Sequence, residues 1–194
     1  MRILGIDPGL DTTGYGIIET EGRNLKLIEA GAITTSQDAG ISERLFRIYD
    51  SLLVIIRKNN PQVLILEKLY SHYKHPTTAI LMGHARGVIC LASSATNIEL
   101  VSYPAKTAKK AVTGNGNASK EQVQRMVATI LGLQKIDGTL DVSDALALAI
   151  SHVYLKVYTS SQIFDRISSE NRQKRSSRSI AKLLSKRGVL ATKF

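Results

Sequence analysis

The stretch Ile3-Leu4-Gly5-Ile6-Asp7-Pro8-Gly9, close to the start of the chain, predicts a strand that ends at a carboxylate. An apolar run closed by turn residues is typical of a buried strand. Pro8 fits the first central position of a turn, and Gly9 is expected to supply the positive φ of a type II turn. Asp7 would then lie at a rigid strand end, where a catalytic carboxylate is well held. An Asp before a turn also caps it by accepting from a backbone N–H, so both roles stay open.

Composition indicates a globular protein with a polyanionic partner. The 194 residues are 43% hydrophobic and 22% charged, which suits one well-buried domain with a short appendage. A formal net charge of +10 favours nucleic acid as the partner, with an anionic membrane surface as the second choice. The single cysteine, Cys90, indicates a fold without disulfides and a reducing, cytoplasmic setting. We expect no segment that crosses a bilayer and no signal peptide before the first strand.

Hydrophobic periodicity predicts an α/β domain in which strands come first and helices are interleaved later. After the first strand, further strands are expected at residues 13–19, 25–34, 62–67 and 98–103, and helices at 42–59, 77–95, 119–131 and 141–153. A lysine-rich helical segment follows Pro104, and Ser119 with Gln122 three residues later predicts a capping box. Gly14 and Gly16 inside the second strand indicate either a bulged edge strand or a close approach by a ligand or another backbone.

The composition changes after residue 158. Residues 159–194 carry nine Lys and Arg side chains against two acids, so they hold +7 of the net charge. Large apolar residues are few in this segment. We therefore predict a domain at residues 1–158 followed by a basic tail, residues 159–194, that is flexible or becomes ordered on binding.

Four acids stand at the ends of predicted elements. Asp7 and Glu67 each end a buried strand, and Asp141 and Asp144 are neighbours on one face of the last core helix. Clustered carboxylates need a cation, and all-oxygen ligation favours Mg²⁺ or Mn²⁺ over zinc. Two such ions about 3.5–4 Å apart clamp the attacking and leaving oxygens of a phosphodiester. Helix capping is the alternative for Asp141 and Asp144, but four acids in a basic chain favour a metal-dependent nuclease.

Several short motifs, in this order, resemble the RuvC family of Holliday-junction resolvases, which belongs to the ribonuclease H-like superfamily. The motifs are Ile3-Leu4-Gly5-Ile6-Asp7-Pro8-Gly9, Thr13-Gly14-Tyr15-Gly16, Leu66-Glu67, Ala85-Arg86-Gly87, Gly114-Asn115-Gly116 with Lys120, and Asp141-Val142-Ser143-Asp144-Ala145-Leu146-Ala147. The resemblance covers about residues 1–154. It implies a ribonuclease H-like fold, with a five-stranded mixed sheet flanked by helices.

The same resemblance implies a magnesium-dependent endodeoxyribonuclease that resolves four-way junctions by paired symmetric nicks in DNA recombination and repair. Each site would hold two Mg²⁺ ions, for which Mn²⁺ could substitute. The implied metal ligands and catalytic residues are Asp7, Glu67, Asp141 and Asp144. A homodimer on four-way junction DNA is implied, with proteins of a branch-migration complex as further partners.

Other positions are compared with the family residue by residue. Lys109 and Lys120 match family lysines that approach the DNA backbone near the scissile phosphate. Tyr70 stands where close relatives carry a phenylalanine that wedges against junction bases, and a tyrosine ring can also stack. Asp11 departs from the family pattern close to Asp7. We interpret it as a turn residue that could disturb the metal site.

Three other functions stay open on the residues alone. Asp-x-Gly at a strand end, followed by Thr and Gly, also resembles the phosphate loop of the actin, sugar kinase and heat-shock ATPase group. That group needs two such domains and a second phosphate loop, and this chain is too short for both. A catalytically silent junction binder leaves the four acids unexplained. An endonuclease acting on RNA or on ordinary duplex would share the same site.

Overall fold

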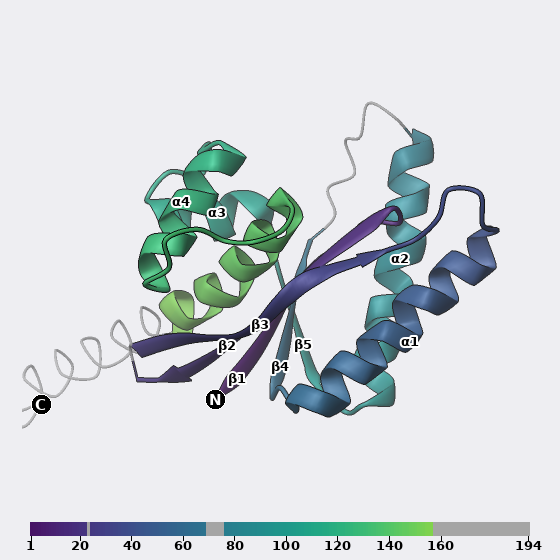
Figure 1. Ribbon diagram of the computed structural model, residues 1–194, viewed down its shortest axis with the longest axis horizontal. Helices are drawn as coiled ribbons and strands as arrows, with labels where there is room; N and C mark the ends of the chain where they lie inside the picture. The colour runs from purple at the N-terminus through teal and green to yellow at the C-terminus, as the bar shows by residue number, and fades with distance from the viewer. Residues whose placement is uncertain (23, 69–75, 157–194) are drawn as a thin grey trace, which may run out of the picture. The chain divides into compact units, whose positions relative to one another are not determined.

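The computed structural model describes residues 1–22, 24–68 and 76–156, and Met1–Tyr154 form one compact α/β unit (Figure 1). Its five-stranded sheet has the order β3-β2-β1-β4-β5. The strands are β1 (Arg2–Asp7), β2 (Thr12–Glu21), β3 (Asn24–Thr34), β4 (Val63–Glu67) and β5 (Glu99–Tyr103). β2 pairs antiparallel with β1 and β3, whereas β4 pairs parallel with β1 and β5. The predicted five-stranded mixed sheet is therefore confirmed.

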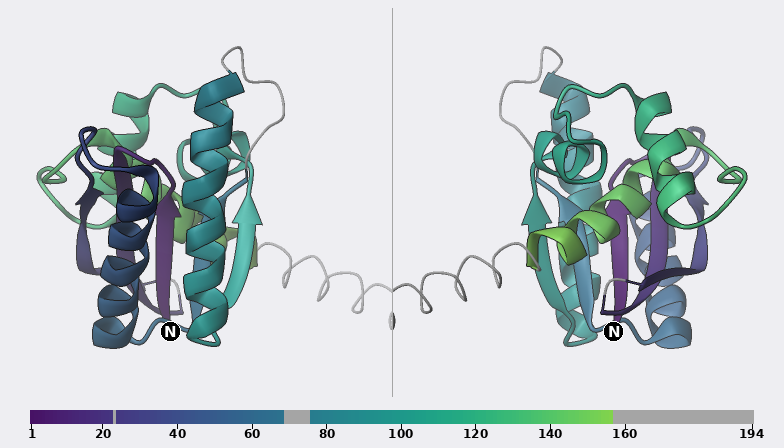
Figure 2. Two further views of the ribbon diagram at one scale, coloured as in Figure 1. Left: turned by 90° about the vertical axis from the view of Figure 1, so that its right-hand side faces the viewer. Right: turned by 90° about the vertical axis from the view of Figure 1, so that its left-hand side faces the viewer.

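Helices cover both faces of the sheet (Figure 2). One face packs against α1 (Ile41–Asn59) and α2 (Pro76–Ala95). The other face packs against α3 (Ala105–Thr113), α4 (Lys120–Ile130) and a helix at residues 140–156, here called the site helix. Each face has its own hydrophobic cluster. The sheet is thus the middle layer of three.

The pleat of the strands decides which face each strand-end acid occupies. Ile6 and Leu66, which precede the two acids, lie in the cluster under α1 and α2. Because successive side chains point to opposite faces, Asp7 and Glu67 project toward the side of the site helix. β1 and β4 run parallel with Ile6 opposite Leu66, so the two carboxylates emerge side by side at one edge of the sheet.

Glycines let the site helix lie directly on the sheet. A β carbon at Gly5 would lie 2.0 Å from the carbonyl oxygen of Ala145, and one at Gly14 would lie 2.3 Å from that of Asp141. Of the two interpretations of the glycine-rich second strand, the close approach of another backbone is confirmed. The edge position in the alternative is wrong, because β2 lies between β1 and β3, although its pairing with β3 does carry a register shift at Ile17 and Ile18.

The loop after β1 is not the expected type II turn. Gly9 does not adopt a positive φ. Glycine is required there for a different reason, since a β carbon would lie 2.2 Å from the carbonyl oxygen of Thr12. Two hydroxyl groups hold this loop: Thr13 Oγ1 donates to the Gly9 carbonyl at 2.6 Å, and Thr35 Oγ1 donates to the Leu10 carbonyl at 2.6 Å. The strand end is thus fixed by packing and side-chain hydrogen bonds.

The predicted capping box at Ser119 and Gln122 is confirmed. Contrary to the sequence expectation, Thr77–Ala95 is long and apolar enough to cross a membrane by length and composition, with 22% of its apolar window buried. These two properties are weak evidence for a membrane span, because core helices of globular proteins also have them.

Three sequence predictions lie outside the described residues: the domain boundary at 158, the basic tail and the role of Tyr70.

Candidate metal centre

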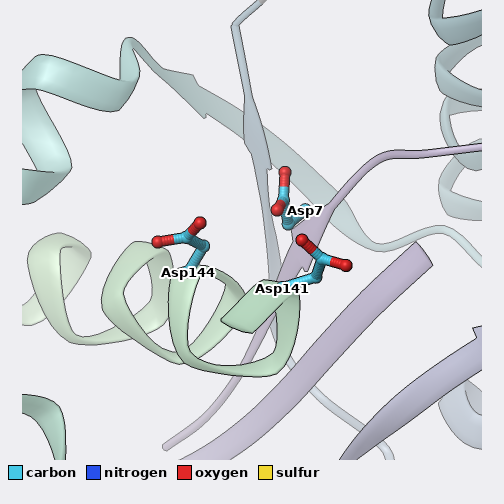
Figure 3. A group of neighbouring side chains, drawn as sticks. All are labelled: Asp7, Asp141 and Asp144. Atoms are coloured by element: carbon cyan, nitrogen blue, oxygen red, sulfur yellow. The ribbon is translucent and has the colours of Figure 1, made fainter. Parts of the chain in front are cut away.

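Three carboxylates meet where β1 ends and the site helix begins (Figure 3). Ligand atoms of Asp7, Asp141 and Asp144 lie within 4.8 Å of one another. The site helix begins at residue 140, which places Asp141 in its first turn and Asp144 one turn further on the same face. Asp141 therefore complements the helix dipole, which is the helix-capping role considered as an alternative for it, and it also faces Asp7. The structure brings these three predicted residues together, and their role as ligands stays a prediction.

Glu67 adds a fourth acid from the end of β4. It lies outside the 4.8 Å group but lines the same cleft as the three aspartates. Its carboxyl group is close enough to that of Asp7 for each to influence the pKa of the other. All four sequence-predicted acids thus share one site.

Burial and crowding change the acid–base behaviour of this cluster. Burial, followed by the carboxylates of Glu67 and Asp144, raises the pKa of Asp7 to about 8. Burial likewise raises the pKa of Glu67. Both shifts favour the neutral form, so the metal-free cluster retains a proton at neutral pH. A bound divalent cation would reverse this preference, and the all-oxygen donor set fits Mg²⁺ or Mn²⁺.

Lys120 already brings a positive charge to the acids. Its Nζ lies 3.3 Å from Asp141 Oδ1 and 3.0 Å from Asp144 Oδ2. Burial opposes its charged form, but the hydrogen bond to Asp144 and the surrounding carboxylates raise the pKa of Lys120. The capping box at Ser119 fixes the start of α4 and with it the position of this side chain. A cation held against the same carboxylates supports the assignment of a cation site.

The acids open into a cleft of about 670 Å³. Its walls come from the loop after β1, the first turns of α2, α3, and the site helix. Lys109 also lines it, and its Nζ donates to the carbonyl oxygen of Ala118 at 2.9 Å. Both sequence-predicted lysines are therefore at the site, where their charges favour an approaching phosphate backbone.

Asp11 is engaged by partners outside the acid cluster. Arg44 Nη2 forms an ion pair with Asp11 Oδ1, and Gln37 Nε2 donates to Asp11 Oδ2 at 2.9 Å. Arg44 Nε also donates to Thr35 Oγ1 at 2.8 Å. Asp11 therefore connects the loop after β1 to the start of α1, in agreement with its interpretation as a turn residue.

The comparisons with known proteins agree with the motifs. The family model of crossover junction endodeoxyribonuclease RuvC matches residues 3–152. The chain belongs to the RuvC family. A RuvC from Rhodopirellula baltica is 46% identical over 153 residues, which cover 79% of this chain and 86% of that protein. A RuvC from Alkaliphilus oremlandii is 45% identical over 159 residues, which cover 82% and 96% respectively.

Solved RuvC structures share the fold. The T. thermophilus RuvC in complex with Holliday junction substrate matches with a TM-score of 0.76 and 29% identity, covering 80% of this chain and 94% of that one. The yeast mitochondrial Holliday junction resolvase Ydc2 matches with a TM-score of 0.58 at 13% identity, covering 78% and 77%, which supports the fold alone. The expected ribonuclease H-like α/β fold is confirmed.

Arg86 has no role assigned from the sequence, although it stands in a RuvC-family motif. Its Nη1 donates to the carbonyl oxygen of Glu67, and its Nη2 donates to Ser102 Oγ at 3.0 Å. The sequence signal for this residue is an arginine between two small residues, Ala85 and Gly87, inside an apolar helix.

The raised pKa of Asp7 predicts a pH-dependent metal affinity. A metal ion must displace the proton that the free cluster holds below about pH 8. We expect the apparent Mg²⁺ affinity to rise by up to about tenfold per pH unit from pH 6 toward pH 8 and then to level off. Isothermal titration calorimetry at pH 6, 7, 8 and 9 measures this. An affinity that does not change between pH 6 and pH 8 would contradict the shared proton.

Proposed function

We propose that this protein is a structure-specific endonuclease that resolves four-way DNA junctions by paired symmetric nicks, in homologous recombination and DNA repair. The observation that supports this most is the carboxylate cluster of Asp7, Asp141 and Asp144 in a cleft that two lysines also line. Membership of the RuvC family and the T. thermophilus relative solved with Holliday junction substrate support the same substrate.

We assign the four acids of the cleft as ligands of Mg²⁺, with Mn²⁺ as a substitute and two ions in each site. Two divalent ions would balance the charge of four carboxylates and would supply activation of water and stabilisation of the leaving 3′ oxygen. Lys109 and Lys120 hold the phosphate backbone at the cleft, because both side chains line it. Since Lys120 contacts Asp141 and Asp144 in the metal-free protein, we expect it to turn toward the DNA phosphate when metal binds.

Two further assignments concern residues outside the described ranges, and that of Tyr70 rests on the family resemblance whereas that of the tail rests on its charge. We propose that Tyr70 stacks on junction bases and that the basic tail contacts DNA or branch-migration proteins. We place the activity in the cytoplasm, in keeping with the free cysteine, Cys90.

The test of this function uses a synthetic four-way DNA junction with one labelled strand, beside a linear duplex of matched sequence. We expect paired symmetric nicks on the junction, none on the duplex, and none without Mg²⁺ or Mn²⁺. Tight binding without cutting in either metal would identify a silent junction binder. Equal cutting of the duplex would identify a nuclease of broader substrate range.

We also propose that the protein acts as a homodimer that pairs through the exposed face of α2. Ile80 and Leu91 are 59% and 58% exposed, and Gly83 and Gly87 have open space around them. Apolar side chains beside small residues allow two helices to approach closely, and a two-fold dimer suits a junction cut symmetrically in two strands.

Leu91→Arg is expected to convert the dimer to a monomer while the protein remains folded, because the side chain is exposed. Size-exclusion chromatography with light scattering measures the mass. Val54→Arg, on α1 and equally exposed at 58%, is the matched control and should stay dimeric. A dimer that survives Leu91→Arg would rule out this interface.

A further inference from the structure

Arg86 is the one Lys, Arg, Asp or Glu residue within α2. It lies on the side of the helix that packs against the sheet, where Ala85 and Ile89 are fully buried. A guanidinium in such a partly buried place needs hydrogen-bond acceptors, because burying an unpaired charge is costly. Its acceptors are the Glu67 carbonyl oxygen and Ser102 Oγ.

The two acceptors belong to neighbouring strands, at the point where both strands end. β4 and β5 pair with Glu67 opposite Tyr103. Lys68 N–H then donates to the carbonyl oxygen of Tyr103 at 2.8 Å, which closes the pair beyond Glu67. Arg86 therefore connects α2 to both strands at the residue that supplies a metal-site acid.

The opposite face of the sheet is held at the same point. Tyr103 Oη pairs with His152 Nδ1 at 2.9 Å, and His152 belongs to the site helix that carries Asp141 and Asp144. The end of β4 and β5 is thus fixed from α2 on one face and from the site helix on the other. Planar guanidinium groups suit the first task, because their donors reach two acceptors in fixed directions.

We infer that Arg86 is a positioning residue of the metal centre, which acts by fixing the backbone from which the Glu67 carboxylate reaches the ions. This inference rests on the proposed ligation of metal by Glu67. The Arg86 guanidinium contacts the carbonyl oxygen of Glu67, and the Glu67 side chain projects from the other face toward Asp7. Catalytic groups must be held to within about 0.5 Å, and groups that orient ligands account for about 10–100-fold in metal affinity.

The test measures Mn²⁺ binding to the full chain without DNA, by calorimetry, together with metal-free junction binding and the Mg²⁺ dependence of cleavage. For Arg86→Gln we expect Mn²⁺ affinity to fall about 10–100-fold and the Mg²⁺ concentration for half-maximal cleavage to rise by a similar factor. Junction binding without metal should stay within about twofold, since no phosphate contact is removed. Arg86→Lys should restore part of the affinity, because a lysine reaches one acceptor but not both.

Arg2 provides the matched control. Its Nη1 donates to the Asn59 carbonyl oxygen at 2.9 Å and its Nε contacts Glu19 Oε1 at 3.1 Å, at the opposite end of β1 from Asp7. Arg2→Gln removes a comparable bridge and should lower the melting temperature without changing Mn²⁺ affinity. Ser102→Ala removes one acceptor, leaves Arg86 in place and should weaken Mn²⁺ binding about threefold. This variant replaces Arg86→Gln as the test if Arg86→Gln does not fold.

The outcomes separate this inference from the proposed function. Wild-type Mn²⁺ affinity in folded Arg86→Gln, or in Ser102→Ala, would show that Arg86 has only a structural role. If the wild-type protein binds Mn²⁺ but does not cut junctions, the proposed function fails while the comparison of affinities still decides the role of Arg86. If the wild-type protein binds no Mn²⁺, the metal centre and the role of Arg86 are both wrong.

Discussion

Asp7→Asn is expected to abolish junction cleavage, lowering the rate by at least about 10³-fold. The loss should exceed the reduction of about 10–100-fold that is typical for a residue that contacts a metal ligand but not the metal. Asp7 belongs to the carboxylate cluster itself. Asparagine has the same shape, so the cleft is preserved while a negative charge is removed. Junction binding without metal should be kept at neutral pH, where Asp7 is already mostly protonated, and improved above about pH 8, where its carboxylate would repel the phosphates. Single-turnover cleavage and gel-shift assays on the same junction measure the two effects.

The same substitution should stabilise the metal-free protein. The folded state raises the pKa of Asp7 to about 8 from its usual value of 3.8, so it binds this proton more tightly than the unfolded chain does. Its stability therefore declines as the pH rises from about 4 to about 8. At pH 8 we expect Asp7→Asn to melt at least about 3 °C higher than wild type, equivalent to ~1 kcal/mol for a domain of this size.

Asp50→Asn, on α1, serves as the control for charge removal and should leave cleavage unchanged. Cleavage by Asp7→Asn at the wild-type rate would refute the metal-site assignment. A melting temperature of Asp7→Asn below that of wild type at pH 8 would contradict the raised pKa of Asp7.

Gly5→Ala is expected to damage both the fold and the metal centre. The added β carbon would lie 2.0 Å from the Ala145 carbonyl oxygen, which belongs to helix backbone and cannot rotate away. The site helix must then shift, at a cost of about 1–3 kcal/mol or more. Gly5 stands two residues before Asp7, and Ala145 follows Asp144 directly. A shift of about 1 Å between these two proposed ligands should reduce cleavage about 100-fold, even at temperatures where the variant is folded.

Denaturant unfolding and cleavage at saturating Mg²⁺ measure these two losses. Gly40→Ala is the matched control, since open space surrounds Gly40 and its φ of −63° suits alanine. Gly40 is the N-cap of α1, so alanine there should lower the free energy of unfolding by no more than about 1 kcal/mol and should leave cleavage unchanged. A Gly5→Ala variant as stable and active as wild type would show that the helix does not depend on this contact.

The sequence predicted the parts of the site that depend on local pattern. Asp7 and Glu67 could be placed at strand ends because apolar runs lead to them, and Asp141 and Asp144 could be placed on one helix face by their spacing. Parallel pairing of β1 and β4, which brings the two strand ends together, is a tertiary event. The burial that raises the pKa of Asp7 was likewise not predictable from its neighbours in sequence.

Long-range packing explains the failures. Turn statistics predict a positive φ for Gly9, which it does not adopt. Glycine is needed there because the Thr12 carbonyl oxygen leaves no room for a β carbon. Of the two interpretations of the second strand, the edge position fails because β3 pairs along its outer side, which its glycines do not indicate. The bridge from Arg86 to Glu67 and Ser102 depends on three elements meeting, which no single motif encodes.

The order in which the acids occur along the chain has a consequence for biosynthesis. Asp7 is made before Asp141 and Asp144, which follow more than 130 residues later. A nascent chain can pair β1 with β2 early, because the two strands are neighbours in sequence. It cannot assemble the carboxylate cluster until the site helix has been translated and has docked on the glycine-lined strands. A translation product that ends before residue 144 therefore lacks part of the proposed metal centre.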